Sequence, residues 1–260
     1  MSDEHPFEPL GSPPAPAEQE PSPQIVLERD PFWGYADAVV FCILIIGSLI
    51  AGFTLVGAFA WLLHLSFSAR VTELLAAQAL GYILAFAALA LLFRVQYHRP
   101  FWRSLGWKSF PLNPAVVMGC GVATAIGVAL VSVLLKTPTT SNRITEMLQD
   151  PKAVVAVAAF GLTLGPLAEE LIFRGFLQPL LARSLGAVSG IFAAAIPFGL
   201  LHFQEYGNSW RHALLISLAG AAFGWMRHVT GSTRASTLMH ASYNALEFIA
   251  YFAQKDSLHT

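Results

Sequence analysis

Three groups of residues with polar members interrupt long apolar stretches of this sequence, and their spacing places pairs of side chains on shared helix faces. The groups contain Glu169, Glu170 and Arg174; Phe198 and His202; and His240 and Asn244. Residues four apart lie on the same face of an α-helix. One carboxylate, two imidazoles and an amide that converge on a water supply a general base, a second proton-handling group and an oxyanion donor. The pattern indicates hydrolytic chemistry.

The first group separates its two carboxylates. At roughly 100° per residue, Glu170 and Arg174 lie about 40° apart, which is the spacing of an i,i+4 ion pair. Glu169 points about 100° away from Glu170 and has no partner on its own helix. Glu170 and Arg174 are therefore expected to neutralise each other, while Glu169 faces something else. A purely structural ion pair is the alternative, but it explains only Glu170 and Arg174.

The two histidine groups have ordinary interpretations when each is taken alone. A lone histidine such as His202, near a helix end, more often makes a hydrogen bond or reaches the interface than it acts in catalysis. His240 and Asn244 could simply make hydrogen bonds between helices, which contribute about 0.6 kcal/mol each in membranes. Glu247, one turn after Asn244, could join this face or lie near the interface. Only the three groups together favour a functional site.

The composition indicates what kind of element carries these residues. Hydrophobic residues make up 55% of the 260 residues and charged residues only 12%, against roughly 25% charged in ordinary soluble domains. Intervals without Asp, Glu, Lys or Arg cover 38–69, 74–93, 109–135 and 184–204. Each interval can hold the roughly 17–25 apolar residues of a membrane-spanning helix. The chain is therefore predicted to be a polytopic membrane protein.

We expect an all-α membrane bundle of about seven transmembrane helices around a polar cavity. The expected spans are 37–63, 74–93, 115–135, 152–184 with a break or kink at Gly165-Pro166, 187–203, 213–226 and 235–252. The helix count changes by one if the chain breaks at Gly165-Pro166. A charge at the bilayer centre costs at least about 2.5–3.5 kcal/mol, so ionisable residues inside these spans are functional by default.

The N-terminal residues differ in composition from the rest of the chain. Residues 1–32 hold seven of the 16 acids and eight of the 16 prolines, which predicts a disordered tail, and residues 33–255 form the transmembrane domain. With the tail in the cytoplasm, eight Lys and Arg residues lie on its side and six on the other. This bias slightly favours a cytoplasmic N-terminus in the cell membrane. The net charge of −1 indicates no nucleic-acid partner.

The order of the three motifs resembles a known family. E-E-x-x-x-R on one apolar segment, F-x-x-x-H on the next and H-x-x-x-N on the last is similar to the CPBP family. These CAAX-protease and bacteriocin-processing enzymes, also called Abi proteins, include the type II CAAX prenyl endopeptidases. The resemblance covers about residues 152–250, which would form the catalytic core.

The resemblance implies an intramembrane endopeptidase acting on a membrane-associated protein or peptide. By carry-over, Glu169 with His202 would activate the attacking water, and His240 with Asn244 would bind the oxyanion. Glu170, Arg174 and Phe198 would support the site. The substrate stays open among a prenylated CAAX tail, a leader peptide and a membrane protein.

The metal dependence and two rival functions stay open at this point. Glu169, His202 and His240 could bind a catalytic zinc, but H-E-x-x-H is absent, and we expect no cofactor. One rival is a non-catalytic scaffold or regulator of the same family, although intact motifs favour the protease. The other is a small proton-coupled transporter, which usually shows broken helices in both halves, whereas here only Gly165-Pro166 interrupts a helix.

Overall fold

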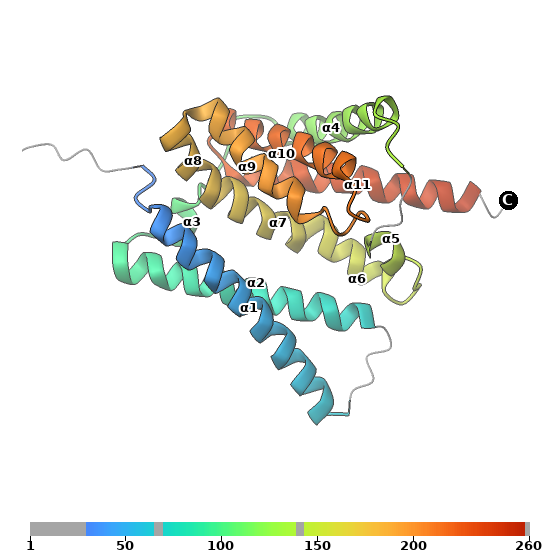
Figure 1. Ribbon diagram of the computed structural model, residues 1–260, viewed down its shortest axis with the longest axis horizontal. Helices are drawn as coiled ribbons and strands as arrows, with labels where there is room; N and C mark the ends of the chain where they lie inside the picture. Colours follow the sequence, from blue (N-terminus) through green and yellow to red (C-terminus); the bar gives the residue numbers. More distant parts are fainter. Residues whose placement is uncertain (1–29, 65–69, 139–142, 258–260) are drawn as a thin grey trace, which may run out of the picture.

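The computed structural model describes residues 30–64, 70–138 and 143–257, and all regular structure within them is helical (Figure 1). By length and apolar composition, four helices among these residues are able to cross a membrane: Tyr35–Leu62, Val71–Tyr97, Pro114–Leu134 and Val154–Leu185. The predicted all-α membrane bundle is confirmed. The exact count of seven spans stays a prediction, and most of the predicted tail, residues 1–29, lies outside the described residues.

The first half of the chain forms a helical hairpin and one further long helix. The elements are α1 (Tyr35–Leu62), α2 (Arg70–Tyr97), the short α3 (Phe101–Ser104), α4 (Pro114–Leu134) and the short α5 (Arg143–Met147). A β-carbon at Gly52 would lie 2.4 Å from the Ala77 carbonyl oxygen, so α1 and α2 touch backbone to backbone. Small residues allow this close approach in membrane helix pairs.

The segment that carries Glu169 is one continuous helical rod from Val154 to Leu185. Its parts are α6 (Val154–Ala159), the π turn η1 (Phe160–Leu164), α7 (Gly165–Glu170), the π stretch η2 (Leu171–Leu177) and α8 (Gln178–Leu185). Of the break or kink expected at Gly165-Pro166, a break is not found, because the helix continues through these residues. A π turn next to Pro166 keeps the chain helical although proline lacks the N–H that a helix needs.

Three helices complete the bundle: α9 (Ala187–Leu201), α10 (Trp210–Thr230) and α11 (Thr233–Ser257). His202 was expected inside the span 187–203, but α9 ends at Leu201 and His202 is the residue that caps it. The backbone N–H of His202 donates to the Gly199 carbonyl, a tightened final turn that ends the helix. His202 is thus at a helix end, where its backbone is less constrained.

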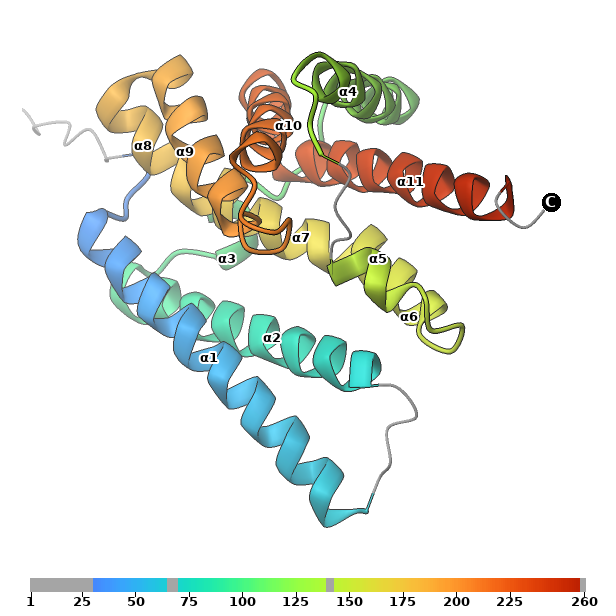
Figure 2. The ribbon, with the colours of Figure 1, turned by 45° about the vertical axis from the view of Figure 1, so that its right-hand side comes forward.

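The rod Val154–Leu185 lies in the middle of the molecule. In both views the α1–α2 hairpin lies on one side of it, and α9, α10, α11 and α4 lie on the other (Figures 1 and 2). At its α8 end, Trp33 is buried in stacked contact with Phe93 and Phe176, and its indole N–H donates to the Phe176 carbonyl at 3.2 Å. Phe32 packs against the same cluster, so the packed chain already includes the last residues assigned to the tail.

Candidate active site

The Glu170–Arg174 pair is buried in the middle of the bundle. Arg174 Nη1 lies 3.0 Å from Glu170 Oε1, and the two side chains are 1% and 0% exposed. Arg174 Nη2 donates to the Gly220 carbonyl at 2.7 Å, and the guanidinium carbon lies 4.3 Å from the centre of the Phe198 ring. The i,i+4 geometry expected from the spacing is present, and α9 and α10 add a ring face and a carbonyl to it.

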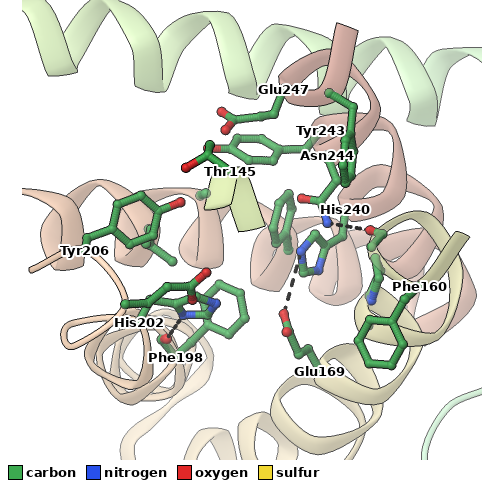
Figure 3. Close-up of a pocket in the computed structure, with 18 of the residues that line it drawn as sticks. Thr145, Phe160, Glu169, Phe198, His202, Tyr206, His240, Tyr243, Asn244 and Glu247 are labelled. Carbon is green, nitrogen blue, oxygen red and sulfur yellow. Dashed lines mark hydrogen bonds and ion pairs between the residues drawn. The ribbon is translucent and has the colours of Figure 1, made fainter. Parts of the chain in front are cut away.

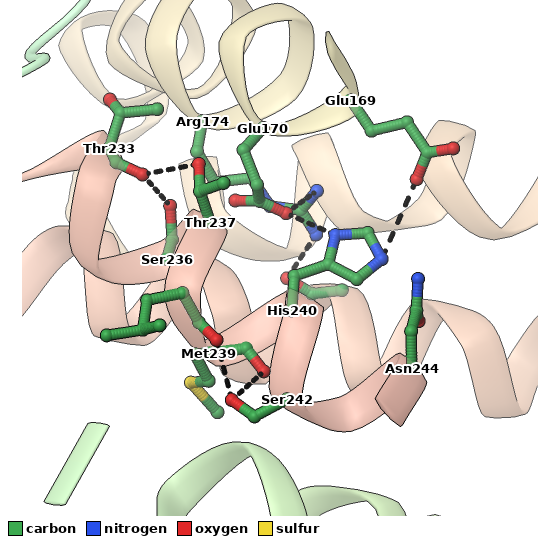
Figure 4. Close-up of polar contacts among 12 residues, drawn as sticks. Glu169, Glu170, Arg174, Thr233, Ser236, Thr237, Met239, His240, Ser242 and Asn244 are labelled. Atoms are coloured by element: carbon green, nitrogen blue, oxygen red, sulfur yellow. Dashed lines mark hydrogen bonds and ion pairs between the residues drawn. The ribbon is translucent and has the colours of Figure 1, made fainter. Parts of the chain in front are cut away.

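Glu170 also holds His240, a contact between two helices (Figure 4). His240 Nδ1 lies 3.1 Å from Glu170 Oε1, and the imidazole stacks on Phe223 with ring centres 4.5 Å apart. A carboxylate on one ring nitrogen fixes the tautomer and the orientation of an imidazole. His240 therefore donates its Nδ1–H to Glu170 and directs Nε2 toward Glu169.

Glu169 faces away from the ion pair, as its position on the helix predicts. Its side chain is 27% exposed, and Glu169 Oε2 lies 3.8 Å from His240 Nε2. This separation is longer than a direct hydrogen bond. The two adjacent carboxylates thus have different environments: Glu170 is buried between two cationic or proton-donating groups, and Glu169 meets open space.

His202 and Phe198 lie side by side at the end of α9. His202 Nδ1 lies 2.9 Å from the Phe198 carbonyl oxygen, which accepts the Nδ1–H. The opposite nitrogen, Nε2, keeps its lone pair and is able to accept a proton. The Phe198 ring makes T-shaped contacts with both His202 and His240, with ring centres 5.2 and 5.9 Å apart.

Asn244 makes a contact that its spacing from His240 did not predict. Its side-chain Nδ2 donates to the carbonyl of Gly161 in η1 at 2.8 Å (Figure 3). An amide NH₂ has two N–H groups, so one is bound to the main chain and the other is left for a ligand.

These side chains surround a common cavity (Figure 3). It has a volume of about 200 Å³ and is lined by Glu169, Phe198, His202, His240 and Asn244 among others. Glu169 and His202 also line a second cavity, or hollow, of about 620 Å³. Since a water occupies roughly 30 Å³ in the liquid, the first cavity has room for several waters.

Residues 151–246 match the family model of the type II CAAX prenyl endopeptidases, Rce1-like. The match spans all three motifs, from Glu169 to Asn244, and it agrees closely with the region 152–250 assigned by resemblance. The resemblance to CPBP-family intramembrane proteases is thereby confirmed for this segment. Comparisons with curated proteins and with solved structures found no match.

Further residues that the motifs did not single out also line the cavity. Phe160, Glu205, Tyr206, Phe223, Tyr243 and Glu247 line it. Glu247 lies one turn after Asn244, so helical periodicity indicated it as a possible member of this face. Glu205 and Tyr206 lie after the end of α9, where no periodicity exists to reveal the direction of a side chain.

The proposed zinc ligands do not form a ready-made metal site. Within the described ranges, no group of three or more His, Cys, Asp or Glu side chains is arranged to hold a metal ion. Glu169 Oε2 lies 3.8 Å from His240 Nε2, and the contact of His240 Nδ1 with Glu170 is compatible with metal binding by Nε2. Metal dependence stays a prediction that chelation can test.

Proposed function

We propose that this protein is an intramembrane endopeptidase that hydrolyses a peptide bond of a membrane-associated protein or peptide. The single observation that carries the proposal is the shared cavity: Glu169, His202, His240 and Asn244 come from three separate helical segments and line the same space. The Rce1-like match over residues 151–246 supports the same activity.

In the proposed reaction, Glu169 and His202 hold and activate one water. The water oxygen bonds to the carbonyl carbon of the scissile peptide, and Glu169 accepts a proton from the water at the same time. His202 Nε2 accepts a hydrogen bond from the same water. The C–N bond then breaks, and Glu169 returns the proton to the leaving amine. The products are a new carboxyl terminus and a new amino terminus.

The oxyanion of the tetrahedral intermediate is proposed to bind His240 and Asn244. His240 gives its Nδ1–H to Glu170, so an Nε2–H for the oxyanion requires the doubly protonated imidazole. Asn244 supplies the amide N–H that Gly161 does not use. Glu170, Arg174 and Phe198 keep these donors in place, and fixed donors of this type contribute roughly 2.7–4 kcal/mol each to lowering the barrier.

We propose that the protein lies in the cell membrane with a cytoplasmic N-terminus, because more Lys and Arg residues then lie on the cytoplasmic side. Apolar helices around the cavity lower the local dielectric constant, which strengthens each electrostatic interaction inside it. The expected partners are the lipid bilayer and a membrane-associated substrate.

The proposal is tested by hydrolysis in ¹⁸O-labelled water. Substrates are first found by comparing membrane proteomes of cells that make the wild-type protein or Glu169→Ala. A peptide spanning the cleavage site, with and without a prenyl group, is then incubated with purified protein in proteoliposomes. We expect one ¹⁸O atom in the new carboxyl terminus of the product. Intact peptides from every proteome-identified site would contradict the proposal.

A further inference from the structure

The π turn η1 leaves one backbone carbonyl without the helical donor that its position requires. The Gly165 N–H donates to the Phe160 carbonyl, five residues earlier. Continuing this pattern, the carbonyl of Gly161 would accept from residue 166. Residue 166 is proline and has no N–H. A helical carbonyl that lacks its donor loses a hydrogen bond worth about 0.5–1.5 kcal/mol.

Asn244 supplies a donor to this same carbonyl. Its Nδ2 lies 2.8 Å from the Gly161 oxygen and comes from α11, 83 residues further along the chain. The side-chain amide has the same N–H chemistry as the backbone donor that Pro166 lacks. The contact therefore completes the hydrogen bonding of the rod across a helix–helix interface.

The surroundings of Gly161 fit this close approach of α11. A β-carbon at Gly161 would lie 3.0 Å from the Phe248 ring, and Phe248 follows Asn244 by one helical turn. Asn244 and Phe248 thus contact the π turn from the same face of α11. The absence of a side chain at Gly161 lets α11 come close enough for the amide to reach the carbonyl.

The π turn determines where Glu169 points. A π turn holds one residue more than an α turn, and one residue corresponds to a rotation of about 100° around the helix axis. Glu169 lies three residues after Pro166, so its direction relative to α6 depends on whether η1 keeps its extra residue. His240, which lies 3.8 Å from Glu169, is one turn before Asn244 on α11.

We infer that Asn244 is a positioning residue that takes the place of the N–H missing at Pro166 and so fixes Glu169 opposite His240. This role is additional to the oxyanion contact, and its effect on activity rests on the proposed function. This role explains why Pro166, the π turn η1 and Asn244 occur together in this chain.

The test is a double-mutant cycle on melting temperature, using the full-length protein in detergent. In Pro166→Ala, the Gly161 carbonyl gains a backbone donor in either form of the turn. If the turn stays π, the donor is the N–H of residue 166, and if it becomes an α turn, the donor is the N–H of Gly165. Asn244→Ala is expected to lower the melting temperature by about 2–6 °C in the wild-type background. The same substitution in Pro166→Ala is expected to lower it by less than half as much. Equal losses in the two backgrounds, or no loss in the wild type, would overturn the inference.

Gln178 provides a matched control. Its side-chain amide also donates to a backbone carbonyl on another helix, that of Gly224 at 2.9 Å, but this carbonyl lies outside the π turn. Gln178→Ala is expected to lower the melting temperature equally in the wild-type and Pro166→Ala backgrounds, because distant sites are additive. Coupling of Gln178 to Pro166 as strong as that of Asn244 would also overturn the inference.

A second variant tests positioning without changing Asn244 or Pro166. Gly161→Ala pushes the Phe248 ring away from η1 and is expected to lower kcat by about 10–100-fold, as a displacement near 1 Å does, with KM unchanged. Phe248→Leu in the same chain is expected to restore part of kcat. An unchanged kcat, or an effect on KM alone, would contradict positioning. A wild-type protein without peptidase activity would refute the proposed function, and the melting cycle would still decide the Asn244 contact.

Discussion

Glu170 shows how much of the site depends on one residue. Its Oε1 is within 3.0 Å of Arg174 Nη1 and 3.1 Å of His240 Nδ1, and the side chain is fully buried. The ion pair thus stabilises the rod and also orients an imidazole on another helix. Removing either charge leaves the other buried without compensation, which costs roughly 3–5 kcal/mol.

The first prediction is that Arg174→Ala and Glu170→Ala each lower both thermal stability and activity. The double variant should lose less stability than the sum of the single variants, because it leaves no lone buried charge. Melting curves in detergent measure this, with activity followed in parallel. An Arg174→Ala protein that melts like the wild type but is inactive would instead place Arg174 in direct contact with the reacting groups.

The second prediction concerns metal ions. If Glu169 and His202 activate water without a metal, purified protein should contain no stoichiometric zinc and should keep its activity after dialysis against a chelator. Elemental analysis and a cleavage assay before and after dialysis measure both. One zinc per chain, together with activity that chelation removes and zinc restores, would contradict metal-free water activation and favour Glu169, His202 and His240 as ligands.

Helical periodicity predicted the directions of side chains within a helix but not their partners on other helices. The Glu170–Arg174 pair and the separate direction of Glu169 followed from 100° per residue. The contacts of His240 with Glu170 and of Asn244 with Gly161 did not, because they depend on how closely α11 approaches the rod. A family resemblance assigned roles to these residues, but it contained no distances.

At the scale of the elements, α10 supports the ion pair by coming close to the rod. A β-carbon at Gly220 would lie 2.8 Å from the Phe198 ring and 3.0 Å from Arg174 Nη2. Arg174 reaches the Gly220 carbonyl only because no side chain intervenes. Gly220 therefore allows the hydrogen bond of Arg174 as well as the close packing of two helices.

The third prediction follows from this contact. Gly220→Ala should displace Arg174 or Phe198 and lower stability by about 1–3 kcal/mol, as overpacking does. Gly119 in α4 is the matched control, since nothing lies within 4 Å of a β-carbon placed there. Gly119→Ala should be neutral or stabilising, because alanine favours a helix by about 1 kcal/mol over glycine. Equal melting temperatures for the two variants would contradict this account of α10.

At Gly165-Pro166, the local sequence alone does not predict the course of the helix. Proline predicts a break because it removes an N–H and crowds the preceding turn. The rod instead stays helical by forming η1 and by accepting a donor from α11 at Gly161. The compensating residue is far away in the chain, so a local pattern could not reveal it.

For the whole molecule, hydrophobic length was the most informative property of the sequence. The charge-free intervals placed the first three spans near α1, α2 and α4 because a membrane demands a minimum length of apolar helix. No comparable local signal indicated that the α1–α2 hairpin lies on one side of the rod and that α4, α9, α10 and α11 lie on the other (Figure 2). The cavity arises from that arrangement, so only its polar lining was predictable.

The central claim is that Glu169 is the base in a cavity that the bundle encloses. The most direct measurement compares peptide-bond cleavage by purified wild type, Glu169→Gln and Glu73→Gln, the last being a carboxylate on α2 outside both hollows. We expect kcat to fall by at least about 100-fold in Glu169→Gln, as loss of a general base does, with an unchanged melting temperature and wild-type cleavage by Glu73→Gln. Wild-type turnover by Glu169→Gln would contradict the account and favour a non-catalytic role for this residue.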